Sequence, residues 1–555
     1  MKALITAPFL VLLSLFVISN QSTEENTLVP SFDEKVVQLS LLNCKEGKAV
    51  NQRETFAPAS NVIINVTDVP SDMSFLIIQV HTYQYNVTLS YDRLNLNKVS
   101  NSSLFGSNIG LFLIPKKTNP TQVFLRNDNV RTVEALLAVV PYTDKAPIPG
   151  GCNMEFNIEE APYQKLVVND AFVTVDFQPA SPPPAGKTPR KCEKNDIQQD
   201  VYRVYLTEQD YSIESYFQAI ANMLTPEDII RNGEKISQPA TSSPFRRIYS
   251  AYHGTGSVYA AIATYESRSA AYVPIFTYGC NYVLYPENCQ LLNDTLSSII
   301  CGLVLFVGLL CVFLGHKCPP AELFAIKQIF CFVISYIVVT AFSHYDTTTN
   351  VGISIGGGIV LVIVLSIFSA CTSVDDGALV AVLSCGFLCS SIVYFAVKDS
   401  TGIEENNWVF WSIYLTIALL LMIILSVSSC FSVGPLTAVL SAFMVILPID
   451  YFAGSSLKYI IINVIRRLTV PQFNYAIINP PIQSKDASLI VFWILLAITR
   501  LVNEFCGHIF CILCRRNNAC ACVNIPESAE TPLIGNRGYN ARIVVFMKRR
   551  RYRST

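Results

Sequence analysis

Charged residues are scarce in this chain. Only 15% of its 555 residues are Asp, Glu, Lys or Arg, and the two signs cancel to a formal net charge of −1. Nucleic-acid binding needs clustered excess Lys and Arg, and a disordered chain combines low hydrophobicity with high net charge. Because 51% of the residues are hydrophobic, the composition predicts a membrane protein with a large soluble part and no nucleic-acid partner.

Histidine is also rare, with five residues in the chain. Only His316, His344 and His508 lie in or beside the apolar half, and none of them forms a His-x-x-x-His pair. A membrane hydrolase would need a metal or a general base inside its helices. We therefore expect no enzymatic activity, catalytic residue, metal or cofactor.

Motifs of rhodopsin-type receptors are absent as well. The third long apolar run ends in "ACTSVDD" without an acidic-Arg-aromatic triplet, and the seventh contains no Asn-Pro-x-x-Tyr motif. The turn between the fifth and sixth runs, around "FSVG", is only a few residues long. The sequence therefore argues against a G-protein-coupled receptor of that type.

The amino terminus has the pattern of a secretory signal peptide. It reads "MKALITAPFLVLLSLFVISNQS", with Lys2 before an apolar stretch and small or polar residues after it. We predict a signal peptide over residues 1–19, cut near Ser19. An uncleaved membrane anchor is the alternative, although the stretch is short for crossing roughly 30 Å of hydrocarbon.

The segment after this peptide carries four glycosylation sequons, at Asn65, Asn86, Asn101 and Asn293. Such sites are modified only in the secretory lumen, so they agree with an exported segment and predict a glycoprotein. A chance match remains the alternative for each sequon.

From residue 296 the composition changes to long apolar runs separated by short polar breaks, as expected for membrane helices. We predict an all-α bundle of seven transmembrane helices within residues 296–513, with the amino terminus outside. The predicted spans are 296–315, 323–342, 351–370, 378–397, 409–430, 433–448 and 487–498.

The distribution of positive charge supports this topology at the carboxyl end only. The basic tail, 514–555, includes the cluster "KRRRYR" and should lie in the cytosol. The loop between the sixth and seventh spans should lie outside, yet it contains Lys458, Arg466, Arg467 and Lys485. Its segment "KYIIINVIRRL" predicts an amphipathic helix that either lies on the membrane or packs against the ectodomain.

The third span begins "VGISIGGG", in which Gly352 and Gly356 form a pair of small residues four positions apart. Such a pair lets another helix approach closely. We expect packing within the chain, with association between two copies as the alternative.

The exported segment alternates between apolar and polar residues, for example in "NVIINVTDV" and "KLVVNDAFVTVDFQP". Alternation with turn residues between runs is typical of antiparallel sheet. We predict two β-sandwich-like units, 20–180 and 192–294, that meet near the proline-rich stretch 181–191. One large sandwich with insertions is the alternative, and "SIESYFQAIANMLTPEDII" is the one clearly helical stretch.

Five cysteines lie in this exported segment, where cysteines usually form disulfides. Cys152 follows "PGG", has no CxxC partner and has no histidine at ligand spacing, which argues against a metal ligand or a nucleophile.

Two ectodomain motifs, "IPGGCNMEF" and "SAAYVPIFTYGCNY", resemble the seven-transmembrane superfamily member 3 family. The resemblance covers the signal, the ectodomain and all seven spans. It implies a multi-pass glycoprotein linked to cell survival under stress, with no established enzymatic activity.

The resemblance also matches the family's ectodomain cysteines to Cys152, Cys192, Cys280 and Cys289 and leaves Cys44 unpaired. Cys280 and Cys289 flank a short segment containing Pro286, so we expect them to pair, and Cys152 then pairs with Cys192. The rival connectivity is Cys152 with Cys280 and Cys192 with Cys289.

A second group of cysteines crowds the predicted cytosolic exit of the last span, where palmitoylation is plausible and a zinc site is the alternative. The candidates are Cys506, Cys511, Cys514, Cys520 and Cys522. Further on, "SAETPLIG" resembles a dileucine sorting signal at Leu533 and Ile534, although Glu530 is one position too close.

Two functional hypotheses follow. The first is a receptor-like or scaffold protein whose ectodomain binds an extracellular or luminal protein. Its helices contact membrane lipid, and the protein is a candidate homo-oligomer. The second is a channel or transporter with an accessory ectodomain, because charged residues within spans often mark a pathway. Its candidate residues are Glu322, Lys327, Asp450, Arg500 and Glu504. We expect residence in the plasma membrane, with the endolysosomal membrane as the alternative.

Overall fold

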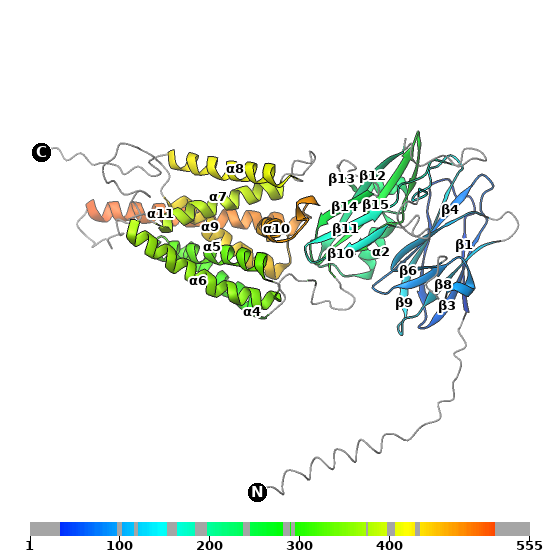
Figure 1. Cartoon of the computed structure of the whole chain (residues 1–555), viewed down its shortest axis with the longest axis horizontal. Coiled ribbons are helices and arrows are strands. Elements are labelled where there is room, and N and C mark those ends of the chain that lie inside the picture. The colour runs from blue at the N-terminus through cyan, green and yellow to red at the C-terminus, as the bar shows by residue number, and fades with distance from the viewer. Residues whose placement is uncertain are drawn as a thin grey trace, which may run out of the picture.

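The molecule has a β-rich half and a helical half, joined end to end (Figure 1). The computed structural model describes residues 34–96, 103–115, 120–152, 164–183, 197–236, 245–280, 289, 295–343, 345–372, 376–396, 406–427 and 433–516. The predicted signal peptide and the basic tail beyond residue 516 lie outside the described residues. The predicted fold class, a β-rich ectodomain followed by membrane helices, is confirmed.

The first sandwich consists of two sheets, ordered β1-β3-β8-β5-β6 and β2-β9-β4-β7. Its core follows from alternation: in β3 the side chains of Val62, Ile64 and Val66 are buried between the sheets, whereas Asn65 faces the other way. The strands are β1 (Glu34–Ser40), β2 (Val50–Phe56), β3 (Ser60–Thr67), β4 (Phe75–Thr82), β5 (Val87–Ser90), β6 (Ser103–Gly106), β7 (Asn108–Leu113), β8 (Thr121–Asn127) and β9 (Val133–Tyr142). A short 3-10 turn, η1 (Arg93–Asn95), follows β5.

The second sandwich pairs the sheets β10-β11-β14-β18 and β13-β12-β15-β16, and β17 pairs with β15. Its strands are β10 (Lys165–Val168), β11 (Phe172–Phe177), β12 (Gln198–Glu208), β13 (Glu234–Ile236), β14 (Phe245–Ser250), β15 (Thr255–Tyr265), β16 (Arg268–Ala271), β17 (Ile275–Thr277) and β18 (Ala476–Ile477). The predicted helical stretch forms two helices, α2 (Ile213–Ala221) and α3 (Pro226–Asn232). They are separate because Thr225 caps a new helix that begins with proline.

The boundary between the sandwiches differs from the prediction. Strands β10 and β11 lie before the proline-rich stretch 181–191, and the sequence placed them in the first unit. In the structure β11 pairs along its length with β14, from Phe172 opposite Ser250 to Phe177 opposite Phe245. Residues 165–177 therefore belong to the second sandwich.

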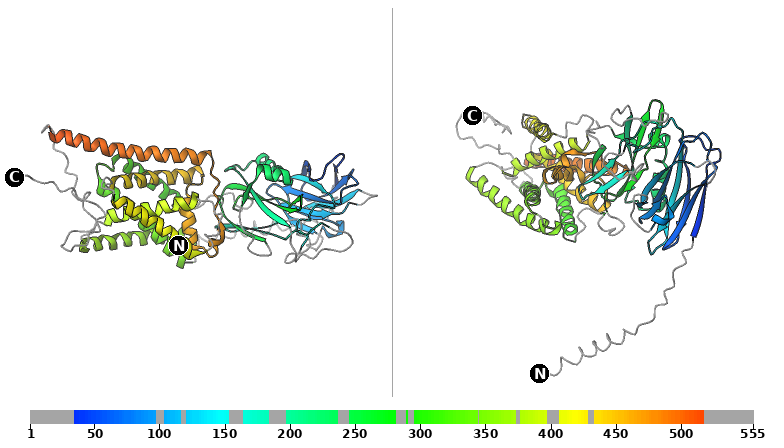
Figure 2. Two further views of the ribbon diagram at one scale, coloured as in Figure 1. Left: turned by 90° about the horizontal axis from the view of Figure 1, so that it is seen from above. Right: turned by 45° about the vertical axis from the view of Figure 1, so that its right-hand side comes forward.

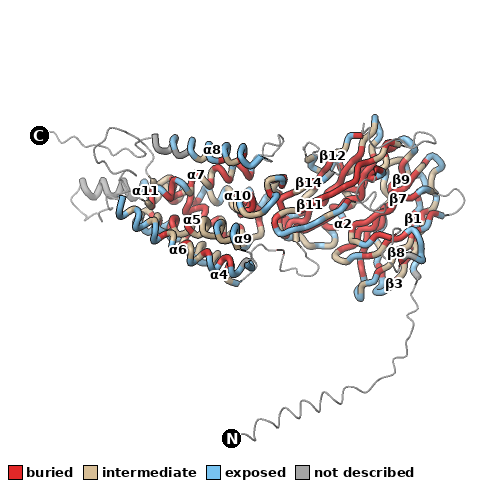
Figure 3. The backbone as a smooth tube through the Cα atoms, viewed as in Figure 1, coloured by how far each residue is buried: buried red, intermediate tan, exposed pale blue. Residues whose placement is uncertain are grey.

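The two sandwiches pack directly against each other. Every residue of β4 is buried, because one face of its sheet covers the first core and the other contacts the second sandwich, where Phe75 and Ile77 pack with Ala270 and Val273. At this contact Tyr216 of α2 donates a hydrogen bond to the carbonyl oxygen of Thr82, with 2.9 Å between the oxygens. Figure 3 shows the resulting buried segments in both sandwiches and across their contact. The ectodomain is thus a single packed body of two domains.

Among the described residues the helical half contains seven long helices, and α11 runs along the length of the bundle (Figure 2). Six helices in the described part of the chain are long and apolar enough to cross a membrane, and the apolar segment Asn407–Leu420 of α8 would make a seventh span. The long helices are α4 (Thr295–Leu314), α5 (Pro319–Phe342), α6 (Thr347–Thr372), α7 (Asp376–Ala396), α8 (Asn407–Val427), α9 (Val433–Ala453) and α11 (Ser484–Arg516).

The last two predicted spans are too short. The sequence ended the sixth at residue 448 because of Asp450, and the seventh at 498 because of Arg500. Both charged residues lie inside longer helices, α9 and α11, where buried partners bind them. Charge therefore does not end these helices.

The expected intramolecular role of the Gly352–Gly356 pair is wrong. Both glycines are exposed on α6, with no side chain or backbone of the described residues near enough to touch an added Cβ atom. Gly357 and Gly358 make the close approach instead, against Ser335 and Phe332 of α5.

The structure forms the predicted Cys280–Cys289 disulfide, with an α-carbon separation of 5.2 Å. The rival connectivity is therefore wrong, and Cys44 carries a free thiol. Cys152 is disulfide-bonded, but Cys192 lies outside the described residues, so a bond between these two stays a prediction.

Candidate functional site: the junction of ectodomain and membrane helices

The segment between α9 and α11 joins the two halves of the molecule. It contains α10 (Tyr459–Thr469), the 3-10 turn η5 (Phe473–Tyr475) and β18. Strand β18 lies parallel to β14, with Ala476 opposite Ile248 and Ile477 opposite Tyr249, and so becomes an edge strand of the second sandwich. The ectodomain sheet therefore includes residues from a loop of the membrane domain.

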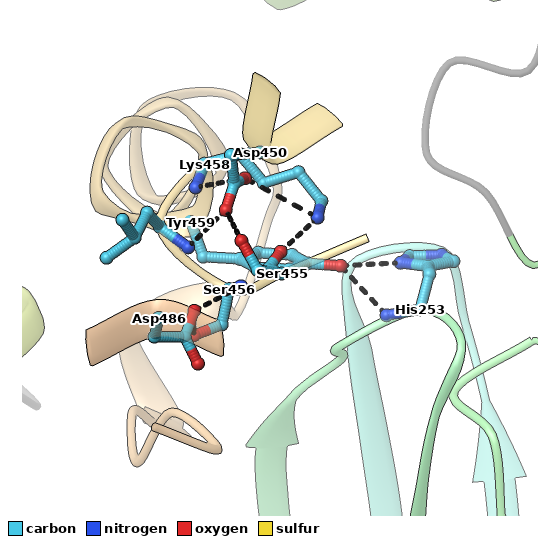
Figure 4. A network of polar contacts seen from close by, with 8 residues as sticks. His253, Asp450, Ser455, Ser456, Lys458, Tyr459 and Asp486 are labelled. Carbon is cyan, nitrogen blue, oxygen red and sulfur yellow. Dashed lines mark hydrogen bonds and ion pairs between the residues drawn. The ribbon is translucent and has the colours of Figure 1, made fainter. Parts of the chain in front are cut away.

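Asp450 organises the start of this segment (Figure 4). Its carboxylate is fully buried and accepts hydrogen bonds from the backbone N–H groups of Leu457 (3.0 Å) and Lys458 (2.8 Å) and from the hydroxyl of Ser455. The Lys458 ammonium lies 3.6 Å from the same carboxylate. Asp450 thus fixes the turn that leads from α9 into α10.

A second buried carboxylate, Asp486 in the first turn of α11, holds the same turn from the other side. Its Oδ1 atom accepts from the backbone N–H (2.7 Å) and the hydroxyl (2.9 Å) of Ser456, and its Oδ2 atom accepts from the backbone N–H of Gln483 (2.8 Å). The two aspartates together tie α9, α10 and α11 at one point.

The amphipathic helix α10 packs against the ectodomain, which decides between the two alternatives left open by the sequence. Arg466 donates from Nη1 to the carbonyl oxygen of Ala251 (2.8 Å) and from Nη2 to that of Asp170 (2.9 Å). The Tyr459 hydroxyl accepts from the backbone N–H of His253 (2.8 Å), as Figure 4 shows. Tyr459 and Arg466 of α10 therefore face the ectodomain.

The next residue, Arg467, faces the membrane helices. Its guanidinium lies 3.7 Å from the ring centroid of Phe410 in α8 and donates to the hydroxyl of Tyr394 in α7 (3.3 Å). Adjacent arginines thus bind the ectodomain and the bundle. Because Lys458, Arg466 and Arg467 are buried in these contacts, the positive charge of this outer loop does not contradict the topology.

Gln483 provides a further bridge, between β12 and the start of α11. Its side chain accepts from the backbone N–H of Glu208 (3.1 Å) and donates to the carbonyl oxygen of Leu206 (2.7 Å). The Glu208 side chain is buried beside it, within hydrogen-bonding reach of the Asp486 carboxylate.

Two titratable groups of the junction are strongly perturbed. Burial, and then the charge of Asp486, raise the pKa of Glu208 to about 8, against the smaller opposing effects of Lys458 and Lys485. Burial, and then the charges of Arg466 and Lys458, lower the pKa of His253 to about 3. Both groups are therefore neutral in the docked junction at pH 7.

We expect the docked junction to be most stable between about pH 4.5 and 6.5. The raised pKa of Glu208 contributes stability that is full below its ordinary value of 4.5 and is lost as pH rises through about 8. The lowered pKa of His253 contributes stability that is full above 6.5 and is lost as pH falls toward about 3. Thermal unfolding of the full chain across this range should show a plateau with losses on both sides.

The Glu208→Gln variant should lose the alkaline decline and keep the acidic one. The exposed carboxylate of Glu266 offers a matched control, since Glu266→Gln should leave the profile unchanged. An alkaline decline of wild-type size in Glu208→Gln would contradict the assignment.

The charged residues that suggested a transport pathway are paired. Arg500 binds Glu322, with Nη2 and Oε2 separated by 2.6 Å, and contacts Glu504 at 3.1 Å. Lys327 pairs with Asp376 at 2.7 Å. These pairs neutralise charge inside the bundle. The sequence did not predict the pairs Arg500–Glu322 and Lys327–Asp376, because their members lie on different helices, whereas Arg500 and Glu504 are four positions apart on α11.

The structure does not bring the predicted modification sites together. Asn86 is exposed and Asn65 is half-buried on the outer face of β3, whereas Asn101 and Asn293 lie outside the described residues.

Cys506 is an exposed free thiol on α11. Cys511 and Cys514 lie in the last turns of that helix, and Cys520 and Cys522 lie outside the described residues, as does the dileucine-like segment. Palmitoylation and glycosylation stay predictions.

Two sandwiches that dock onto a helical bundle define a multi-pass membrane protein with an immunoglobulin-like ectodomain. Models of TM7SF3-like proteins match its N-terminal immunoglobulin-like domain at residues 48–142 and the second immunoglobulin-like domain at residues 147–283. A model of the TM7S3/TM198-like domain matches residues 301–503. The chain belongs to the TM7SF3-like family, as its two ectodomain motifs suggested.

Named relatives agree with this assignment. Transmembrane 7 superfamily member 3 of Homo sapiens is 28% identical over 465 residues, which cover 79% of this chain and 78% of the relative. The proteins of the same name from Rattus norvegicus and Mus musculus are 29% and 27% identical, and each match covers 79% of both chains.

Proposed function

We propose that the chain is a receptor-like or scaffold protein without enzymatic activity, whose ectodomain binds an extracellular or luminal protein. The observation that carries the proposal is a pair of adjacent arginines on the short helix α10. Arg466 binds the second sandwich, and Arg467 binds the end of α7 and the start of α8. A partner that displaces the ectodomain would act on the bundle through this rigid link rather than through a flexible tether.

The proposal extends to location and role. A plasma-membrane location suits an ectodomain that meets extracellular partners, and an endolysosomal location is the alternative. The role in cell survival under stress is carried over from the family resemblance. Association between copies, and contacts with membrane lipid, belong to the same proposal.

Paired charges favour this function over a channel or transporter. Glu322, Lys327, Asp450, Arg500 and Glu504 each have an oppositely charged partner within 4 Å. A pathway residue must exchange its partners during transport, whereas these pairs explain how charge is accommodated between helices.

Cross-linking tests the proposed function. Full-length protein on living cells is treated with a membrane-impermeant cross-linker and analysed by mass spectrometry. We expect a reproducible extracellular partner attached through lysines of the ectodomain, and slower amide exchange in α10 when that partner is added to purified protein. Cross-links confined to the chain itself, together with ion flux in liposomes that Glu322→Gln abolishes, would support the transporter instead.

A further inference from the structure

The outer face of one ectodomain sheet carries a row of apolar side chains. The sheet β1-β3-β8-β5-β6 belongs to the first sandwich, which lies at the end of the ectodomain away from the helices (Figure 1). Val36 lies opposite Ile63, and Ile63 lies opposite Phe124, so the row crosses three adjacent strands. Val36 is 50% exposed, and the other two are half-buried. The solvent-facing side of such a sheet is usually polar, so an apolar row is more typical of a covered surface.

A glycosylation sequon lies directly beside this row. Asn65 and Thr67 of the sequon alternate with buried residues of β3, so they lie on the same side of the sheet as Ile63. Asn65 lies opposite Gln122 and therefore diagonal to Phe124. Diagonal neighbours on a sheet are about 7–8 Å apart, within reach of a long side chain. A sugar attached to Asn65 therefore reaches Ile63 and Phe124.

Unpartnered acceptors on the same face fit a ligand that is rich in hydroxyl groups. The Oδ1 atoms of Asn61 and Asn65 are buried and have no hydrogen-bond partner among the described residues. N-acetylglucosamine brings hydroxyl and acetamido N–H donors, and its ring carries C–H groups that pack against aromatic and aliphatic side chains. One N-linked glycan therefore offers partners to both the polar and the apolar groups of this face.

The charge of the face agrees with an uncharged occupant. On one side of the apolar row lie Gln38, Asn65 and Gln122, which are all uncharged. On the other side the cation of Arg126 is paired with Asp128. These side chains offer no complementary charge to a strongly acidic or basic partner, whereas the core of an N-linked glycan needs none.

We propose that Asn65 carries an N-linked glycan that lies over the row of Val36, Ile63 and Phe124. The glycan shields these side chains from water and stabilises the first sandwich. It also keeps this face from contacts with other proteins and with a second copy, so a partner of the ectodomain binds a different surface. The inference does not rest on the proposed receptor function, because it concerns only the exported sheet and its sequon.

The test uses the full chain purified from eukaryotic cells. Intact-glycopeptide mass spectrometry should find a glycan on Asn65. Hydroxyl-radical footprinting then measures the oxidation of Val36, Ile63 and Phe124. We expect slow oxidation of the row in wild type and loss of this protection in Thr67→Ala, which removes the sequon and leaves Asn65 in place. If Thr67→Ala does not fold, enzymatic removal of the glycans from folded wild type takes its place.

Two variants separate the glycan from other effects of substitution. Thr67→Ser changes the same position but keeps the sequon, so it should keep both the glycan and the slow oxidation. Thr88→Ala removes the sequon of Asn86, which is exposed just before β5, and should leave oxidation of the row as in wild type.

Several results would overturn the proposal. They are an unmodified Asn65 in wild type, equal oxidation of the row in wild type and Thr67→Ala, and protection that persists after the glycans are removed. If the persisting protection depends on protein concentration, a second copy covers the face. If it does not, another part of the chain or a co-purified protein covers it.

Discussion

Replacing Arg500 by Ala is expected to destabilise the membrane bundle by about 3–5 kcal/mol. The residue is 2% exposed and neutralises Glu322, which is equally buried, while also contacting Glu504. Its removal leaves two carboxylates close together, with Ser441 as the remaining described donor to Glu322. The loss should appear as a lower unfolding midpoint and a smaller monodisperse fraction in detergent.

Two comparisons isolate the buried pair. Lys317→Ala removes an exposed cation just before α5 and should change the midpoint little. The double variant Arg500→Met with Glu322→Leu replaces the pair by apolar side chains and should be more stable than Arg500→Ala, because the fully buried carboxylate of Glu322 is removed and only the partly exposed Glu504 remains. A double variant less stable than Arg500→Ala would show that the pair itself, rather than its uncompensated charge, dominates the loss.

Replacing Asp450 by Ala should cost a similar amount, about 3–5 kcal/mol, because it removes one side of a buried ion pair. The change also leaves the backbone N–H groups of Leu457 and Lys458 without their acceptor and the Lys458 ammonium without its counter-charge. Amide exchange over residues 459–483 should accelerate, since the turn into α10 depends on this carboxylate. Both a lower midpoint and faster exchange are expected.

Asp346 offers a matched control for this change. It is exposed before α6, on the same side of the bundle, and accepts from the hydroxyl of Thr349 at 2.7 Å. Asp346→Ala should cost about 1 kcal/mol, as other helix caps do, and should leave exchange at 459–483 unchanged. Equal effects of the two substitutions would mean that Asp450 acts as an ordinary cap.

Periodicity predicted the architecture because each element carries its own pattern. Alternation in β3 and the long apolar runs of α4 to α9 are local properties. They were sufficient to predict that a β-rich soluble part is followed by a bundle of membrane helices. The helix at 459–469 was also predictable, including its opposed apolar and polar faces.

Long-range contacts were not predictable from those patterns. Strand β18 has two residues and no period, and its partner β14 lies more than 200 positions earlier in the chain. The assignment of β10 and β11 to the second sandwich depends on the same kind of distant pairing. One usable signal existed: positive residues in a loop expected outside the membrane. Arg466 and Arg467 were interpreted as a topological conflict, although they mark the docking helix.

Hydrogen exchange of the full chain tests most directly whether the ectodomain is docked onto the membrane helices. We expect slow exchange at residues 246–253 and 459–479 together, and joint acceleration of both segments in Arg466→Met, because the Arg466 guanidinium binds both segments. Exchange at 476–477 as fast as in an exposed loop, or acceleration confined to 459–479 in that variant, would contradict the rigid junction.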